Sequence, residues 1–149
     1  MSLHLYLETS VVSAHEDDRY PERKQATVEF WTRLGQYEVA VSELTVTEVE
    51  ATGDSELRER MVALIRPFSV LSVTGEAHAL AGEYIRRGVF SPATVDDALH
   101  VAVAVASGQN LLVSWNFRHL VNRRRRALIN DVNVLLDHPT IEIVAPPEV

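Results

Sequence analysis

Residues 95–106 decide the fold, and they read Val-Asp-Asp-Ala-Leu-His-Val-Ala-Val-Ala-Val-Ala. Beyond the first turn this stretch is apolar except for His100, which predicts a central helix buried on all sides. We expect His100 to be a hydrogen-bonded core histidine rather than a metal ligand. Two acids open the helix, where carboxylates are electrostatically favoured, although one acid suffices for a cap. Because Asp97 shares a face with the apolar residues four and seven places on, we expect Asp97 to turn inward, with Asp96 as the second candidate.

Strand-like runs alternate with helical segments on both sides of this helix. The expected strands cover residues 4–8, 37–41, 68–73, 110–114 and 141–144, and the expected helices cover 23–34, 54–65, 75–87, 95–107 and 122–136, with a short one starting at 43. Such alternation predicts an α/β protein with a mostly parallel sheet that helices cover on both faces. Neither a linker nor a low-complexity segment interrupts the pattern, so we expect one domain over residues 1–149.

The composition is that of an ordinary globular protein, with 46% hydrophobic and 23% charged residues. No apolar run approaches the roughly 20 residues that cross a bilayer, and no secretory signal is visible. Because the chain has no cysteine, it holds neither disulfides nor thiolate metal sites, which is consistent with a reducing compartment. We therefore expect a cytoplasmic protein without a membrane partner.

The net charge of −7 argues against a broad basic surface for nucleic acid. Four arginines are nevertheless grouped at 123–126, and metal ions can neutralise a cluster of carboxylates. The charge therefore lowers the expectation of nucleic-acid binding without removing it. A solvated helix face or an oligomer contact explains the arginine run equally well.

Polar side chains follow the expected strands at the edge where ligands of parallel sheets bind. Glu8 ends the first strand and Ser114 the fourth, so both should face that edge. Glu8 has an alternative role as a cap of the next helix. Glu48 lies among apolar residues on a short helix, where a solvated face is the alternative. Asn116 offers a carbonyl oxygen to a hard cation, or else closes an Asx turn.

These residues place oxygen ligands on separate segments that the fold brings to one edge. A cluster of uncompensated acids repels itself, and such a cluster usually implies a bound cation. A set made of oxygen ligands without cysteine favours Mg²⁺ or Mn²⁺ over zinc.

Four ordered segments also resemble the successive motifs of PIN-domain proteins, especially the toxin-like VapC branch of bacterial toxin–antitoxin systems. They are Tyr6-Leu7-Glu8-Thr9-Ser10, the Ser-Glu-Leu-Thr segment that leads to Glu48, Asp97-Ala98-Leu99-His100-Val101-Ala102, and Leu112 to Leu120. The likeness runs over nearly the whole chain. It implies a three-layer α/β/α sandwich around a five-stranded parallel sheet, and divalent-metal-dependent cleavage of RNA.

The resemblance also implies a role for particular residues. Glu8, Glu48, Asp97 and Asn116 stand at the four catalytic positions, where Glu8 and Asn116 replace the commoner aspartates. Metal ligation falls to Glu8, Glu48 and Asp97, with Asp96 as the further candidate, for Mg²⁺ or Mn²⁺. We assign substrate contacts to Ser10, Ser114, Arg118, Arg123 and Arg124. An antitoxin partner and a homodimer are expected by the same resemblance.

Two rival functions remain. A PIN fold that cleaves nothing and acts through protein partners is favoured by Asn116, which removes a negative charge from the site. A metal-dependent phosphatase is disfavoured, because no acid-x-acid pair follows the first strand and no glycine-rich phosphate loop is visible.

Overall fold

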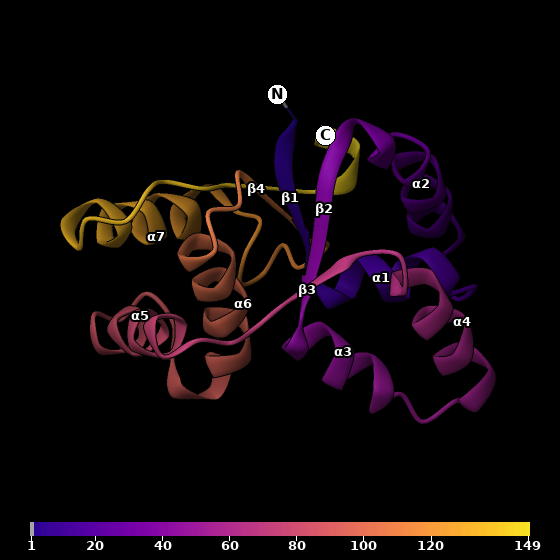
Figure 1. Ribbon diagram of the computed structural model, residues 1–149, viewed down its shortest axis with the longest axis horizontal. Helices are drawn as coiled ribbons and strands as arrows, with labels where there is room; N and C mark the ends of the chain where they lie inside the picture. Colours follow the sequence, from indigo (N-terminus) through magenta and orange to yellow (C-terminus); the bar gives the residue numbers. More distant parts are fainter. Residues whose placement is uncertain (1) are drawn as a thin grey trace.

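The computed structural model describes residues 2–149, which form one parallel sheet covered by helices (Figure 1). The strands are β1 (Leu3–Leu7), β2 (Tyr37–Ser42), β3 (Ser69–Leu71), β4 (Leu111–Val113) and β5 (Glu142–Val144). Their order in the sheet is β3-β2-β1-β4-β5, and every neighbouring pair is parallel. The expected mostly parallel, five-stranded sheet is confirmed.

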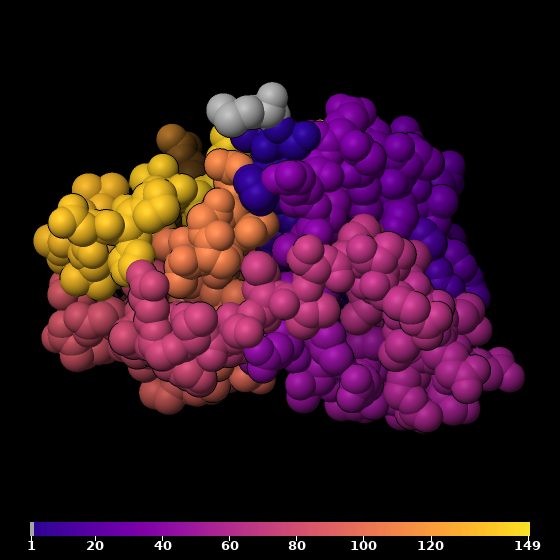
Figure 2. Space-filling view, viewed as in Figure 1, coloured from indigo at the N-terminus to yellow at the C-terminus, as the bar shows by residue number. Residues whose placement is uncertain are grey.

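Helices lie on both faces of the sheet (Figure 1). One face carries α1 (Thr9–Glu16), α2 (Pro21–Trp31), α3 (Glu43–Glu50) and α4 (Ser55–Ile65), and the other carries α5 (Gly75–Arg86), α6 (Val95–Ala106) and α7 (Arg123–Leu135). In the space-filling view the four helices of the first half form one side of the molecule, and α5 to α7 form the other (Figure 2). The expected three-layer sandwich is therefore confirmed.

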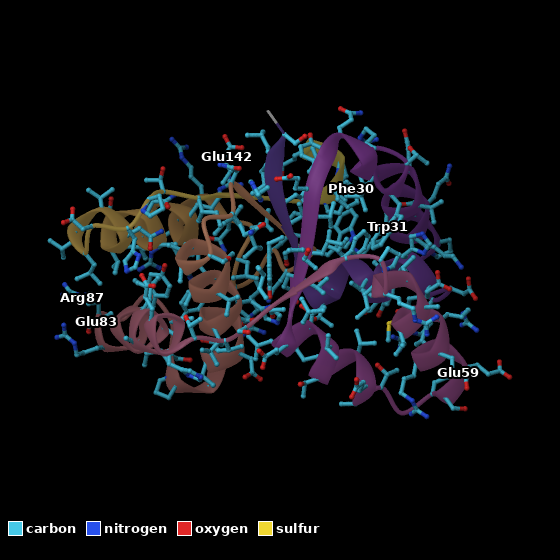
Figure 3. The ribbon with its side chains drawn as sticks, in the orientation of Figure 1. Phe30, Trp31, Glu59, Glu83, Arg87 and Glu142 are labelled. Carbon is cyan, nitrogen blue, oxygen red and sulfur yellow. The ribbon has the colours of Figure 1, made fainter. Side chains whose placement is uncertain are left out.

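The alternation of side chains along the central strands divides the core in two. On β1, Leu5 and Leu7 pack with α1 to α4, while Tyr6 packs with α5 to α7. The α2 side chains Phe30 and Trp31 point from the outside of the molecule toward the sheet (Figure 3). Because both faces of β1 are covered at its carboxyl end, the residues Leu5, Tyr6 and Leu7 are all buried.

Local sequence signals explain most helix ends. Asp54 and Thr74 accept amide hydrogen bonds as the N-caps of α4 and α5, and Asn122 does so for α7. The helix expected over residues 23–34 begins and ends earlier, at Pro21 and Trp31. Proline suits the first helical position, and residues Leu34–Gln36 form a separate 3₁₀ turn. The strands β3 and β4 are shorter than expected, with three residues each.

The helices within residues 2–149 include none with both the length and the apolar character needed to cross a membrane. Even α6, which is buried along most of its length, has only 12 residues. Its apolar character serves the interior of the domain, where it packs against α5 and the sheet.

The strand order reverses beside β1, because β2 and β3 lie on one side of it and β4 and β5 on the other. Leu7 at the end of β1 pairs with Val113 at the end of β4. The next residues of the two strands, Glu8 and Ser114, therefore emerge together at the carboxyl edge, which is where ligands bind in folds of this class.

Candidate functional site

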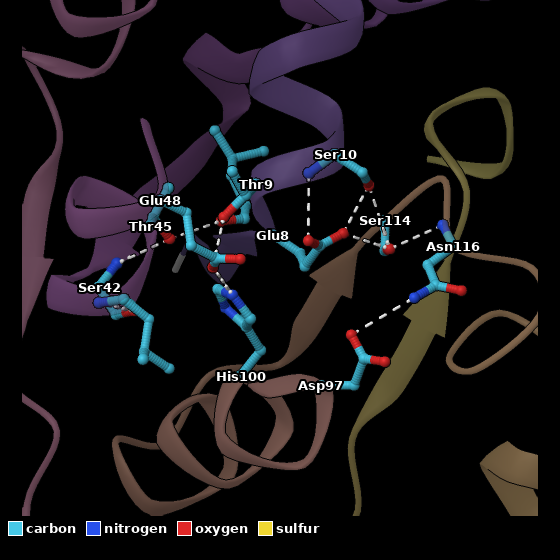
Figure 4. Close-up of polar contacts among 12 residues, drawn as sticks. Glu8, Thr9, Ser10, Ser42, Thr45, Glu48, Asp97, His100, Ser114 and Asn116 are labelled. Carbon is cyan, nitrogen blue, oxygen red and sulfur yellow. Dashed lines mark hydrogen bonds and ion pairs between the residues drawn. The ribbon is translucent and has the colours of Figure 1, made fainter. Parts of the chain in front are cut away.

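Glu8 is held at the reversal point by hydroxyl groups from two directions (Figure 4). It is 7% exposed, and one carboxylate oxygen accepts hydrogen bonds from the Ser10 hydroxyl and, at 2.6 Å, from the Ser114 hydroxyl. Its other oxygen accepts from the Ser10 amide at 3.1 Å, so Glu8 also caps α1. Glu8 thus combines the two roles that the sequence left open, a helix cap and an acid at the ligand edge.

Ser10 and Ser114 connect this carboxylate to the segment after β4. The Ser10 hydroxyl accepts from the Trp115 amide at 2.9 Å, and the Ser114 hydroxyl accepts from the Asn116 amide at 2.9 Å. Each serine therefore orients Glu8 and the β4–α7 loop at once.

Glu48 reaches the same edge from α3, but its carboxylate is bound by other side chains. One oxygen accepts from the Thr9 hydroxyl at 3.0 Å and pairs with Nε2 of His100. The His100 Nδ1 contacts the Tyr6 hydroxyl at 2.6 Å, and that hydroxyl contacts the Ser42 hydroxyl at 2.7 Å. Ser42 caps the helix that carries Glu48, so a closed chain of contacts joins β1, α3 and α6.

The charges of this pair stabilise each other. Burial raises the pKa of the Glu48 carboxyl, but the hydrogen bond and positive charge of His100 outweigh it, so the pKa lies below its usual value. Burial lowers the pKa of the His100 imidazole. The hydrogen bond to Glu48 and the charges of the surrounding carboxylates raise the pKa by more than burial lowers it. The net pKa of His100 is raised, which favours an ion pair.

Asp97 is the third carboxylate at this edge. It lies in the first turn of α6, and its negative charge has the fewest hydrogen-bond donors. Its only side-chain hydrogen bond within residues 2–149 comes from the Asn116 amide nitrogen at 3.4 Å. Burial raises the pKa of the Asp97 carboxyl, and the negative charge of Glu8 raises it further, whereas His119 and His100 oppose the shift. Asp97 is therefore a half-buried acid whose charge is disfavoured by its neighbour.

Asn116 shapes the loop rather than presenting a free oxygen. Its side-chain oxygen accepts from the His119 amide at 2.9 Å, which is the Asx-type turn that the sequence offered as an alternative. Only its amide nitrogen faces Asp97, so in this arrangement Asn116 acts as a donor.

The remaining predicted residues lie away from these contacts. Asp96 is exposed, in contrast to the half-buried Asp97. Arg118, Arg123 and Arg124 are exposed as well. Of the two other arginines in the run, Arg125 stacks on Phe90 at 4.8 Å, and Arg126 donates to the Ile143 carbonyl.

Sequence reasoning missed the part that Tyr6 and His100 play in holding Glu48. Tyr6 sits in an apolar strand and His100 in an apolar helix, so both resemble core residues, and both are completely buried. The available signal was a pair of polar side chains inside two buried elements, since buried polar groups need partners.

The donor set suits a hard cation, although it is not a closed cage. Among residues 2–149 no group of three or more acids or histidines is arranged to hold a metal ion. Mg²⁺ needs only one or two carboxylates, because it keeps several waters and binds substrate phosphate. Glu8 and Asp97 meet that requirement, since burial and the charge of Glu8 raise the pKa of Asp97, and a bound cation would favour its ionised form. Glu48 is engaged by His100 instead.

No family model matches the sequence, and no curated protein matches it either. Solved structures do match. The structure of VapBC2 from Rickettsia felis, bound to a promoter DNA fragment, superposes with a TM-score of 0.63 at 10% identity, over 96% of this chain and 98% of that one. VapC20 from Mycobacterium tuberculosis, a toxin that cleaves the sarcin–ricin loop, superposes with a TM-score of 0.61 at 18% identity, over 77% of this chain and 92% of that one. DNA-bound VapBC from Salmonella typhimurium superposes with a TM-score of 0.59 at 18% identity, over 97% of this chain and 98% of that one.

At identities of 10% to 18%, the structural likeness establishes the fold alone. The chain has the fold of the VapC structures, and the expected PIN-like α/β/α architecture is confirmed.

We predict that Asp97→Asn stabilises the protein in EDTA at pH 7. The pKa of Asp97 is higher in the folded protein than in the unfolded chain. Its contribution to folding stability is therefore complete below the unfolded-state pKa and is lost as pH rises through the folded-state pKa. Removing the charge should raise Tm by roughly 2–4 °C, about 1 kcal/mol, with the difference shrinking as pH falls through the unfolded-state pKa of 3.8, well below which both states are protonated. Thermal unfolding monitored by circular dichroism measures it. A lower Tm for the variant at pH 7 would contradict the assigned repulsion.

We also predict that His100→Gln removes a pH-dependent part of the stability. Because the folded pKa of His100 is raised, its contribution is complete below the ordinary pKa of 6.5 and declines as pH rises through the folded value. The lowered pKa of Glu48 sets the acid limit, since the pair weakens as pH falls through it. Glu48 is partly solvated, so we expect a loss of about 2 kcal/mol near pH 6. Urea unfolding between about pH 5 and pH 9 tests this, and an equal loss at all pH values would argue against the ion pair.

Proposed function

We propose that this chain, which has the fold of the VapC toxins, is a divalent-metal-dependent endoribonuclease and the toxin component of a toxin–antitoxin pair. The observation that carries the proposal is the Glu8–Asp97 pair at the point where the strand order reverses. Burial and the nearby charge of Glu8 both disfavour the ionised form of Asp97, so the two acids at this edge call for a ligand of opposite charge. Phosphodiester hydrolysis at a carboxylate-bound cation is the chemistry that such a pair supports.

In this proposal Glu8 and Asp97 hold Mg²⁺ or Mn²⁺. The bound metal supplies a water of lowered pKa and positive charge beside the scissile phosphate. Glu48 was predicted as a ligand, but it is bound to His100. Asp96 was the further candidate, but it is exposed, so the proposal gives it no part in the site and uses it as the control. The carboxylate oxygens of Glu8 are kept in place by the Ser10 and Ser114 hydroxyls.

The other side chains of the edge would position the RNA. The Asn116 amide nitrogen, which donates toward Asp97, orients this carboxylate. Ser10 lines a neighbouring pocket, whereas Ser114 is completely buried, so in this proposal Ser114 acts through Glu8 rather than by touching the RNA. Exposed Arg118, Arg123 and Arg124 are proposed to contact the RNA backbone, where they offset the overall negative charge of the protein. Arg125 lies over Phe90 instead, where burial lowers the pKa of its guanidinium and the charge of Asp97 opposes that shift.

Partners and location are part of the proposal. VapBC structures that share the fold are toxin–antitoxin assemblies, which supports an inhibitory protein partner. We propose a cytoplasmic homodimer on the basis of the resemblance that the sequence shows.

The second candidate is a non-catalytic binding module with this fold. Asn116 favours it, because the asparagine supplies no negative charge and its oxygen is used in the turn. Glu48 favours it too, because His100 already balances its charge. A protein of this kind would bind an inhibitory partner or itself without cutting RNA.

Cleavage of a mixed set of labelled RNAs separates the two candidates. We expect wild-type protein to cut with Mg²⁺ or Mn²⁺ and not in EDTA, because the acid pair requires the ion. Asp97→Asn should lower the rate by at least about a hundredfold, while the matched control Asp96→Asn retains it. Gel electrophoresis of the fragments gives the rates.

Two outcomes would count against the nuclease. Equal cutting by wild type and Asp97→Asn would exclude the proposed site. The absence of cutting with either metal, together with no rise of the wild-type Tm on adding them, would favour the binding module.

A further inference from the structure

A second recess opens beside the acid pair and has a different chemical character. It is a pocket of about 320 Å³, within the size range of small-molecule sites, between α1, the start of α2 and the loop after β4. Its lining is mixed and consists of Ser10, Ser13, Ala14, Asp17, Tyr20, Arg23, Trp115 and Asn116. Aromatic rings, a guanidinium and polar side chains therefore converge in one place.

The pocket shares its inner wall with the candidate active site. Ser10 lines the pocket, and its hydroxyl donates to Glu8; Asn116 lines it too, and its amide faces Asp97. A ligand in the pocket would therefore lie one side chain away from the carboxylates. That position suits a nucleotide next to the phosphate that is cut.

The floor of the pocket is a stacking surface. The Arg23 guanidinium lies over the Trp115 ring, 4.9 Å from its centroid. The indole is fixed, because its Nε1 donates to the Thr27 hydroxyl at 2.9 Å and its backbone amide donates to Ser10. Arg23 is exposed, so solvent reaches the side chain that lies over the indole. Nucleobases stack on guanidinium planes and aromatic rings of this kind.

Tyr20 and Asp17 complete the walls. The Tyr20 side chain is 58% exposed, and the Arg19 guanidinium lies 5.7 Å from the centroid of its ring. Asp17 accepts two hydrogen bonds from the Arg19 side chain, which holds the pKa of its carboxyl below the usual value. An ionised carboxylate and the Ser13 hydroxyl offer acceptors to the edge of a base.

From this geometry we propose that the pocket binds an unpaired nucleobase of the RNA substrate, stacked on Arg23 and Tyr20 and adjacent to the cleaved phosphate. The inference rests on the proposed function, because it gives the nuclease a contact to single-stranded RNA. Stacking tolerates any base, so it selects for an unstacked nucleotide, and the acceptors Asp17 and Ser13 add a preference for bases that present N–H donors.

Tryptophan fluorescence tests the pocket without any cleavage. The chain has two tryptophans, and Trp31 packs in the apolar core away from the pocket, so Trp31→Phe leaves Trp115 as the reporter. In EDTA we expect nucleoside 5′-monophosphates and a short single-stranded RNA to quench its emission, and ribose 5-phosphate and inorganic phosphate to leave it unchanged. Quenching by ribose 5-phosphate as strong as by nucleotides, or no quenching by any nucleotide, would overturn the proposal.

Surface variants separate stacking from charge. Arg23→Ala should weaken binding of the RNA about tenfold, and Arg23→Lys should weaken it less, because lysine keeps the charge but loses the plane. Tyr20→Ala should weaken binding, whereas Tyr20→Phe should not. Arg66→Ala, which removes an exposed arginine outside the pocket, is the matched control. All three side chains are exposed, so folding should persist, and circular dichroism checks it.

The outcomes keep this inference apart from the nuclease itself. Wild-type affinity in both Arg23→Ala and Tyr20→Ala would refute the pocket even if RNA is cut. Nucleotide-dependent quenching without cleavage would support the pocket and contradict the nuclease.

Discussion

The negative charge of Glu8 at the end of the central strand is the constraint on which the site depends. A carboxylate that is 7% exposed must find donors, and Glu8 finds them in Ser10 at the start of α1 and in Ser114 at the end of β4. These contacts join the two strands at the place where the sheet reverses its order. They also fix the position of Trp115, whose amide donates to Ser10, and through it the wall between the acid pair and the neighbouring pocket.

Three carboxylates lie at this edge, and the hydrogen-bond donors that balance their negative charges differ in number and kind. Glu8 has hydroxyl and amide donors, and Glu48 has the imidazole of His100, whereas Asp97 has a single long contact from Asn116. The unbalanced charge is therefore concentrated between Asp97 and Glu8. Such local instability is common at functional sites, where binding of a ligand supplies the missing interaction.

Much of this arrangement follows from sequence patterns of short range. The apolar stripe of the helix at 95–106 indicated that Asp97 rather than Asp96 turns inward, and the strand ends located Glu8 and Ser114 at one edge. The partner of Glu48 was not predictable, because its pairing with His100 depends on how α3 and α6 pack across the carboxyl edge of the sheet. The same limit applies to Arg23 and Trp115, which are distant in sequence and meet only after α2 has folded against the loop.

Binding of Mn²⁺, followed by the loss of the electron paramagnetic resonance signal of the free ion, tests the central claim most directly. The account predicts that wild-type protein takes up Mn²⁺ in the absence of RNA, that Asp97→Asn loses this uptake, and that Asp96→Asn keeps it. Uptake by Asp97→Asn equal to that of the wild type, or no uptake by the wild type at all, would contradict a cation site formed by Glu8 and Asp97.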